Sequence, residues 1–129
     1  MSNSAINITA GTGTPVDTWL VGSDHQQIVV VRAYPAATAT LSNFGDAVTS
    51  TTLLAANTAR LGAVIYNDST SILYVKFGTA ASITSYTFEI PNDDWLAIPG
   101  DMGVVYTGII TGIWASDAGG SARVTELTA

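Results

Sequence analysis

From residue 48 onward, short segments rich in β-branched and aromatic residues alternate with clusters of turn-forming residues. Turn clusters such as Asn67-Asp68-Ser69-Thr70 and Pro91-Asn92-Asp93-Asp94 separate these segments. No stretch keeps an apolar period of about 3.6 residues over three turns, as a helix would require. Short strands with regularly spaced turns are typical of an antiparallel sandwich or barrel. We therefore expect an all-β fold, an antiparallel β-sandwich of jelly-roll-like type. The expected strands are 49–54, 61–66, 72–77, 85–90, 95–98, 109–115 and 122–127.

Two of these segments show the alternation of a half-buried strand, in which every second side chain points to the same face. In 85–90 the inward set is Tyr86, Phe88 and Ile90, and Ser85, Thr87 and Glu89 point outward. In 72–77 the inward set is Leu73, Val75 and Phe77. Together with Ile113, these two inward sets are the predicted core.

The first 47 residues have a different composition. Residues 1–16 are small and polar, which predicts an extended N-terminal arm. Residues 35–45 are rich in Ala and Thr without periodicity, and we interpret them as a linker. The sequence thus divides into an arm and strand region at 1–47, which would dock or oligomerise, and a sandwich domain at 48–129.

Within the first region, Ile28, Val29, Val30 and Val31 form an uninterrupted apolar run. Such a run is typical of a strand that is covered on both faces. We therefore take these four residues, with Trp19, as candidate interface residues. The run could pair with another subunit or form the centre of this subunit's own sheet.

The surface of this chain must be poor in charge. Only 11% of residues are charged, against about 25% in an ordinary soluble domain, and mean hydropathy is +0.35. Either copies or partners bury much of the surface, or hydroxyl side chains cover the outside of a Thr-rich sandwich. Four basic residues against ten acidic ones leave a net charge of −6, so nucleic acid and anionic membranes are not expected partners. The few charged residues that we single out, Arg60, Lys76, Arg123 and Glu126, could set register at an interface or simply aid solubility.

No combination of residues predicts catalysis, a metal or a cofactor. His25 is the single histidine, and its neighbour Asp24 would point to the opposite face of a strand, so a hydrolytic triad is not indicated. One histidine without cysteine also argues against zinc. Asn92-Asp93-Asp94 with Asp101 offers oxygen ligands for calcium, but a polar turn explains this segment better. We expect no enzyme activity.

Three aromatic residues are candidates for a sugar-stacking face: Trp95, Tyr106 and Trp114. Aromatic rings often line binding sites, but in a small β-protein they more commonly pack in the core or in an interface. Both interpretations remain open at this stage.

The second half of the sequence contains an ordered series of motifs. The motifs are LLAANTARLGAVIYNDST at 53–70, LYVKFG at 73–78, SYT at 85–87, YTGIITGIW at 106–114 and ARVTEL at 122–127. This series resembles a small β-rich module of structural proteins in tailed bacteriophage virions. Residues 17–31 resemble the start of such proteins more weakly. The sequence lacks the extended middle region of longer relatives.

Members of this group are decoration proteins, head fibres and tail-associated proteins, and the resemblance supplies no catalytic residues. It implies a non-enzymatic virion structural protein, and the short chain favours a capsid decoration (cement) protein on the outer head surface. The implied partners are copies of the same chain, for example in a trimer, and the major capsid protein or other virion proteins. The alternative is a tail or fibre component that binds a host surface glycan.

Overall fold

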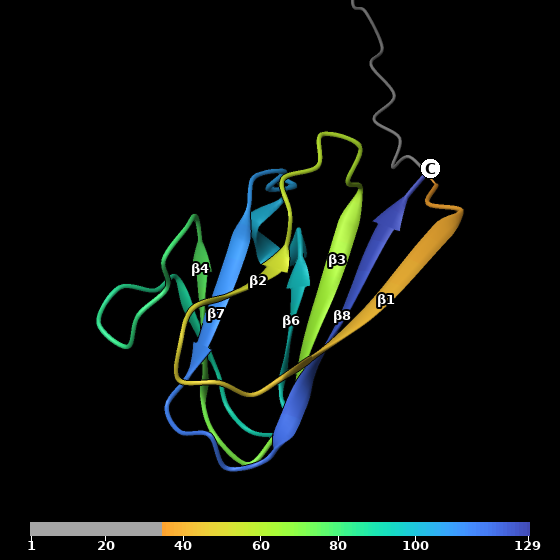
Figure 1. Cartoon of the computed structure of the whole chain (residues 1–129). Helices are drawn as coiled ribbons and strands as arrows, with labels where there is room; N and C mark the ends of the chain where they lie inside the picture. Colours follow the sequence, from red (N-terminus) through yellow and green to blue (C-terminus); the bar gives the residue numbers. More distant parts are fainter. Residues whose placement is uncertain (1–34) are drawn as a thin grey trace, which may run out of the picture. The chain divides into compact units, whose positions relative to one another are not determined.

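The computed structural model describes residues 35–129, which form two four-stranded antiparallel sheets (Figure 1). One sheet has the order β1-β8-β3-β6 and the other has the order β2-β7-β4-β5. The all-β sandwich expected from the sequence is therefore confirmed. The strands are β1 Thr38–Gly45, β2 Thr51–Leu54, β3 Gly62–Ser69, β4 Leu73–Phe77, β5 Phe88–Ile90, β6 Trp95–Ile98, β7 Ile110–Trp114 and β8 Gly120–Thr128, with a short 3-10 helix, η1, at Gly100–Met102.

The strand order is that of a jelly roll. The first strand pairs with the last, the second with the seventh, the third with the sixth and the fourth with the fifth, always antiparallel. This nested pairing places consecutive strands in opposite sheets, except for β4 and β5, which are neighbours in one sheet, as in other eight-stranded jelly rolls. The jelly-roll-like expectation is thus confirmed for the described residues. The N-terminal arm lies outside them, as do Trp19 and the run Ile28, Val29, Val30 and Val31.

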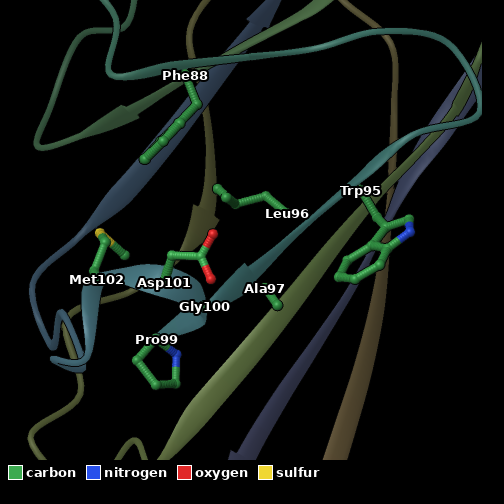
Figure 2. Close-up of a pocket in the computed structure, with 8 residues that line it drawn as sticks. All are labelled: Phe88, Trp95, Leu96, Ala97, Pro99, Gly100, Asp101 and Met102. Atoms are coloured by element: carbon green, nitrogen blue, oxygen red, sulfur yellow. The ribbon is translucent and has the colours of Figure 1, made fainter.

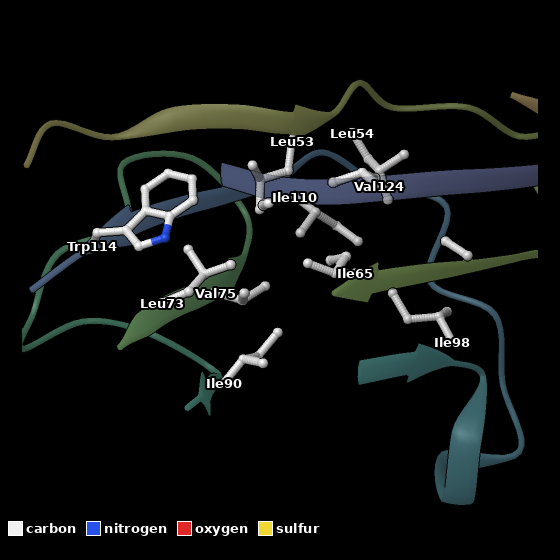
Figure 3. Packing of buried hydrophobic residues seen from close by; sticks show 12 residues of the cluster. Leu53, Leu54, Ile65, Leu73, Val75, Ile90, Ile98, Ile110, Trp114 and Val124 are labelled. Atoms are coloured by element: carbon white, nitrogen blue, oxygen red, sulfur yellow. The ribbon is translucent and has the colours of Figure 1, made fainter. Parts of the chain in front are cut away.

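The core fills the space between the two sheets (Figure 3). β3 shows how it forms: Ala63, Ile65, Asn67 and Ser69 are buried, and the residues between them are half-exposed. Alternation of this kind buries one face of a strand against the opposite sheet. The buried apolar cluster contains Leu53, Leu54, Ala63, Ile65, Leu73, Val75, Ile90, Ile98, Ile110, Trp114, Ala122 and Val124.

The interpretation of residues 38–45 as part of a linker is wrong, and the sandwich begins before residue 48. Residues 38–45, interpreted as part of a linker, form β1, which pairs with β8 along its whole length from Thr38↔Thr128 to Gly45↔Ser121. The pattern was not recognisable because seven of the eight β1 residues are exposed, so they carry no apolar alternation. Long-range pairing, and not local propensity, makes this segment a strand.

The predicted core is correct in part. Leu73, Val75 and Ile90 are buried, whereas Phe88 is half-buried and Tyr86 is exposed. The reason is that β5 begins at Phe88, so Tyr86 lies in the preceding loop, outside the strand alternation. Phe77 and Ile113 are half-buried. The predicted turn at 67–70 is also displaced, because β3 continues through Ser69.

Candidate functional site

A hollow of about 310 Å³ opens on the side of the sandwich where the edge strands β5 and β6 lie (Figure 2). In Figure 2, Phe88, Leu96, Asp101 and Met102 lie on one side of β6 and Trp95 lies on the other. Asp101 is the one titratable group among the lining residues, so the hollow offers an apolar surface with a single carboxylate. Its lining residues are Phe88, Trp95, Leu96, Ala97, Pro99, Gly100, Asp101 and Met102.

Trp95 is an exposed aromatic residue at the rim of this hollow. It begins β6, its side chain is 59% exposed, and it is paired with Tyr66 of β3 on the outer face of the sheet. The Tyr66 hydroxyl donates to Asp93 Oδ1 at 3.3 Å. Partial desolvation, and then the neighbouring Asp93 carboxylate, raise the pKa of Tyr66 above its ordinary value. The phenol therefore keeps its proton, and its capacity to donate, to a higher pH than an ordinary tyrosine.

The three aromatic residues predicted to share a sugar-binding face do not lie together. Trp114 is fully buried in the core, where its indole N–H donates to Asn67 Oδ1 at 3.3 Å, so its proposed solvent-facing role is wrong. Tyr106 is half-buried and stacks on Phe77 with ring centroids 4.7 Å apart and planes 8° from parallel. Only Trp95 of the three is well exposed.

The acidic segment considered for calcium behaves as a turn. Asp94 Oδ1 accepts the backbone N–H of Trp95 at 2.8 Å, and the Asn92 amide donates to the Ser69 carbonyl at 2.7 Å. Asp93 accepts from Tyr66, as described above. Within residues 35–129 no group of three or more His, Cys, Asp or Glu side chains is arranged to hold a metal ion.

Arg60 is buried, which nothing in the sequence indicates. Its guanidinium is fully enclosed and makes an ion pair with Glu126 on β8, with Nε 2.7 Å from Oε2. The same group donates to the carbonyls of Ala55 at 2.6 Å, Tyr106 at 2.6 Å and Gly108 at 3.1 Å. These bonds tie the β2–β3 loop and the β6–β7 loop to the last strand. Arg60 and Glu126 thus hold the subunit's own loops together.

A second buried polar centre lies around Asn67. Its amide donates to the carbonyls of Ser71 and Ile90, each at 2.8 Å, and its Oδ1 accepts from Ser69 Oγ at 2.7 Å and from the Trp114 indole. Every hydrogen-bonding position of the Asn67 side chain is therefore occupied, which is the condition for burying an amide without large cost. The centre joins β3, the β3–β4 loop, β5 and β7, and the polar atoms of the Asn67 side chain are all engaged in it.

Large apolar side chains are distributed over the surface of the described residues. Leu41, Val48, Ile83, Trp95 and Val104 are each more than half exposed. Ile72, Tyr86 and Met102 are exposed to a smaller extent. Single exposed apolar residues are normal, but here they occur on a surface with few charges and beside an apolar hollow. This combination is typical of surfaces that bind other proteins.

Comparison with protein-family models, with curated proteins and with solved structures gives no match. No helix in the described part of the chain is long and apolar enough to cross a membrane. The fold and the surface therefore define the chain as an all-β jelly roll with an apolar hollow between two edge strands. What the protein does is argued below from these features.

Proposed function

We propose that this protein is a non-enzymatic structural subunit of a virion, a capsid decoration protein that binds the outer surface of the head. Two independent features support the proposal. The first is the resemblance of residues 53–127 to phage virion modules, which falls within the jelly roll. The second, which carries the proposal, is the charge-poor surface with its exposed apolar side chains.

The β5–β6 hollow is the surface we assign to the capsid contact. Binding energy between proteins concentrates where an apolar or aromatic anchor fills a pocket and water is excluded around it. A hollow of about 310 Å³ lined by Phe88, Leu96 and Met102 can receive one large apolar side chain. The exposed Trp95 would add apolar area at its rim.

A position on the outer surface of the head is consistent with the negative charge of the chain. Its net charge of −6 would be repelled by packaged DNA, which is itself strongly negative. A subunit that binds only the assembled shell stabilises that shell by mass action, without any chemical step. No catalytic group is needed for such a role.

Co-sedimentation with emptied heads and with isolated tails tests this function. We expect saturable binding to heads, and a higher melting temperature of the decorated shell. Met102→Asp should weaken binding about tenfold or more, because it places a charge in the apolar contact. Val48→Asp, an equally charged change in the β1–β2 loop, is the matched control and should bind as the unmodified protein does. Binding to tails alone, or to neither particle, would contradict the proposal.

A second function, recognition of a host surface glycan by a tail or fibre protein, has one observation in its favour. Trp95 presents an exposed ring beside Tyr66, with the Asp93 carboxylate within hydrogen-bonding reach of the tyrosine. An aromatic ring next to polar groups suits a sugar, which has both an apolar face and hydroxyls. A glycan array that gives signals lost in Trp95→Ala would favour this function over decoration.

A further inference from the structure

The four edge strands of the sandwich differ in how they are protected against pairing with another chain. β2 has four residues and an irregular register between Thr52 and Leu54. β5 has three residues, includes Glu89 and is followed by Pro91. β6 has four residues and is followed by Pro99. Short length, bulges, charges and prolines are the features that keep natural sheet edges from associating.

β1 has none of these protections. It is eight residues long, TATLSNFG, contains no charge and no proline, and runs beside β8 without a register shift. Within residues 35–129 no strand pairs with its other edge. Leu41, at the middle of β1, is 60% exposed. A long, regular and uncharged edge of this kind is a ready template for an added strand.

The register of β1 shows which backbone groups this edge offers. The Asp46 N–H donates to the Gly120 carbonyl at 3.2 Å, in line with the β1–β8 register. Because successive residues of a strand direct their N–H and C=O groups to opposite edges, those of Ser42 and Phe44 also face β8. Ala39, Leu41 and Asn43 then direct theirs to the open edge.

We infer that β1 of one subunit pairs antiparallel with β1 of a second copy, centred on Leu41. In this register Leu41 lies opposite its own copy, and Ala39 lies opposite Asn43. Each free N–H and C=O of these three residues then finds a partner, and the side chains of each pair share one face of the sheet.

The strand's own sequence favours a second copy as the occupant. Pairing two copies places no like charges opposite each other, because β1 is uncharged. It also covers the exposed Leu41 with an identical side chain. The contact is isologous and joins the two β1-β8-β3-β6 sheets into one continuous sheet about a two-fold axis. An isologous contact of this kind predicts that the chain forms dimers and not three-membered rings.

The self-association of the full-length chain tests this inference without any capsid, so its failure is distinguishable from failure of the decoration role. The oligomeric mass would be measured by analytical ultracentrifugation over a range of concentrations. We expect a dimer, and Leu41→Lys should weaken dimerisation about tenfold or more, because two ammonium groups would meet on the axis. Ile83→Lys, at a loop residue that is 58% exposed, is the matched control and should leave the dimer unchanged.

A cross-link tests the register. Directly opposed residues in a hydrogen-bonded antiparallel pair have Cα atoms about 5.5 Å apart, within the range that a disulfide spans. The chain has no cysteine, so Leu41→Cys should give a covalent dimer on mild oxidation, whereas Ile83→Cys should not. A monomer at all concentrations would overturn the inference, as would a dimer that Leu41→Lys does not weaken. Equal cross-linking of both cysteine variants would overturn the Leu41-centred register.

Discussion

Replacement of Arg60 by methionine tests how far one buried cation holds the loops of this fold in place. Arg60→Met keeps most of the apolar stem but removes the ion pair with Glu126 and three hydrogen bonds to loop carbonyls. A hydrogen bond to a charged group contributes about 1.5–3 kcal/mol. The four contacts will not add fully, because groups that share one hydrogen-bond network are not independent. Removing one partner of a buried ion pair typically costs about 3–5 kcal/mol, and we expect a loss of this size.

Arg123→Met is the matched control for this prediction. Arg123 also pairs with a carboxylate, Asp68, at 2.7 Å, but both side chains are well exposed, at 49% and 40%. Exposed ion pairs contribute about 0–1 kcal/mol, so the control should lose no more than that. The two variants share the substitution and the 2.7 Å ion-pair distance. They differ in burial and in the three loop carbonyls that only Arg60 contacts.

Urea unfolding followed by tryptophan fluorescence and circular dichroism would give both free energies of unfolding. The expected loss for Arg60→Met is a large share of the roughly 5–15 kcal/mol by which a domain is usually stable. Should that variant fail to fold, Glu126→Gln keeps an acceptor opposite Arg60 and should lose less. If Arg60→Met and Arg123→Met agree within about 1 kcal/mol, the structural role assigned to the buried guanidinium is wrong.

Three further outcomes follow from the described contacts. Gly120 has φ +117°, and a Cβ at this position would lie 2.5 Å from a backbone atom of Ser69. Gly120→Ala should therefore lower the free energy of unfolding in urea by about 1–3 kcal/mol. Gly45→Ala, with open space around it, should change that free energy by less than about 1 kcal/mol. Leu73→Ala should cost about 2–5 kcal/mol because Leu73 is fully buried, and the half-buried Phe88 should lose less on truncation than the about 3–5 kcal/mol of an enclosed ring. The pKa of Tyr66 is raised in the folded state, so its contribution to stability is present below the ordinary pKa of 10.0 and is lost as the pH rises through the folded-state pKa. In a spectroscopic titration, Tyr66→Phe should lack one tyrosine that ionises late.

The sequence predicts those strands whose own residues show a local apolar alternation or cluster. β4 was recognised from Leu73 and Val75, and β6 from the apolar segment between two turns, because their side chains alternate or cluster locally. β1 was missed because its strand conformation depends on pairing with β8, about eighty residues away, and its exposed side chains show no period.

The candidate sites were harder to predict from sequence. Trp95 is exposed and Trp114 is buried, but the sequence does not distinguish the two rings, since burial depends on which strand neighbours surround each ring. Arg60 and Asn67 look like ordinary surface residues in the sequence. Their burial becomes favourable only when carbonyls from distant loops supply hydrogen-bond acceptors. No local motif encodes that convergence.

The pairing of the first described strand with the last has a consequence during synthesis of the chain. β8 lies between β1 and β3, so neither of these two strands can pair with it until residues 120–128 have been synthesised. Contacts between residues so distant in sequence form slowly, because the entropy of closing a large loop is lost before the contacts contribute any favourable free energy. On the ribosome the uncharged β1 segment would wait without a partner, and growing chains held close together on one messenger RNA would then be at risk of joining through it prematurely.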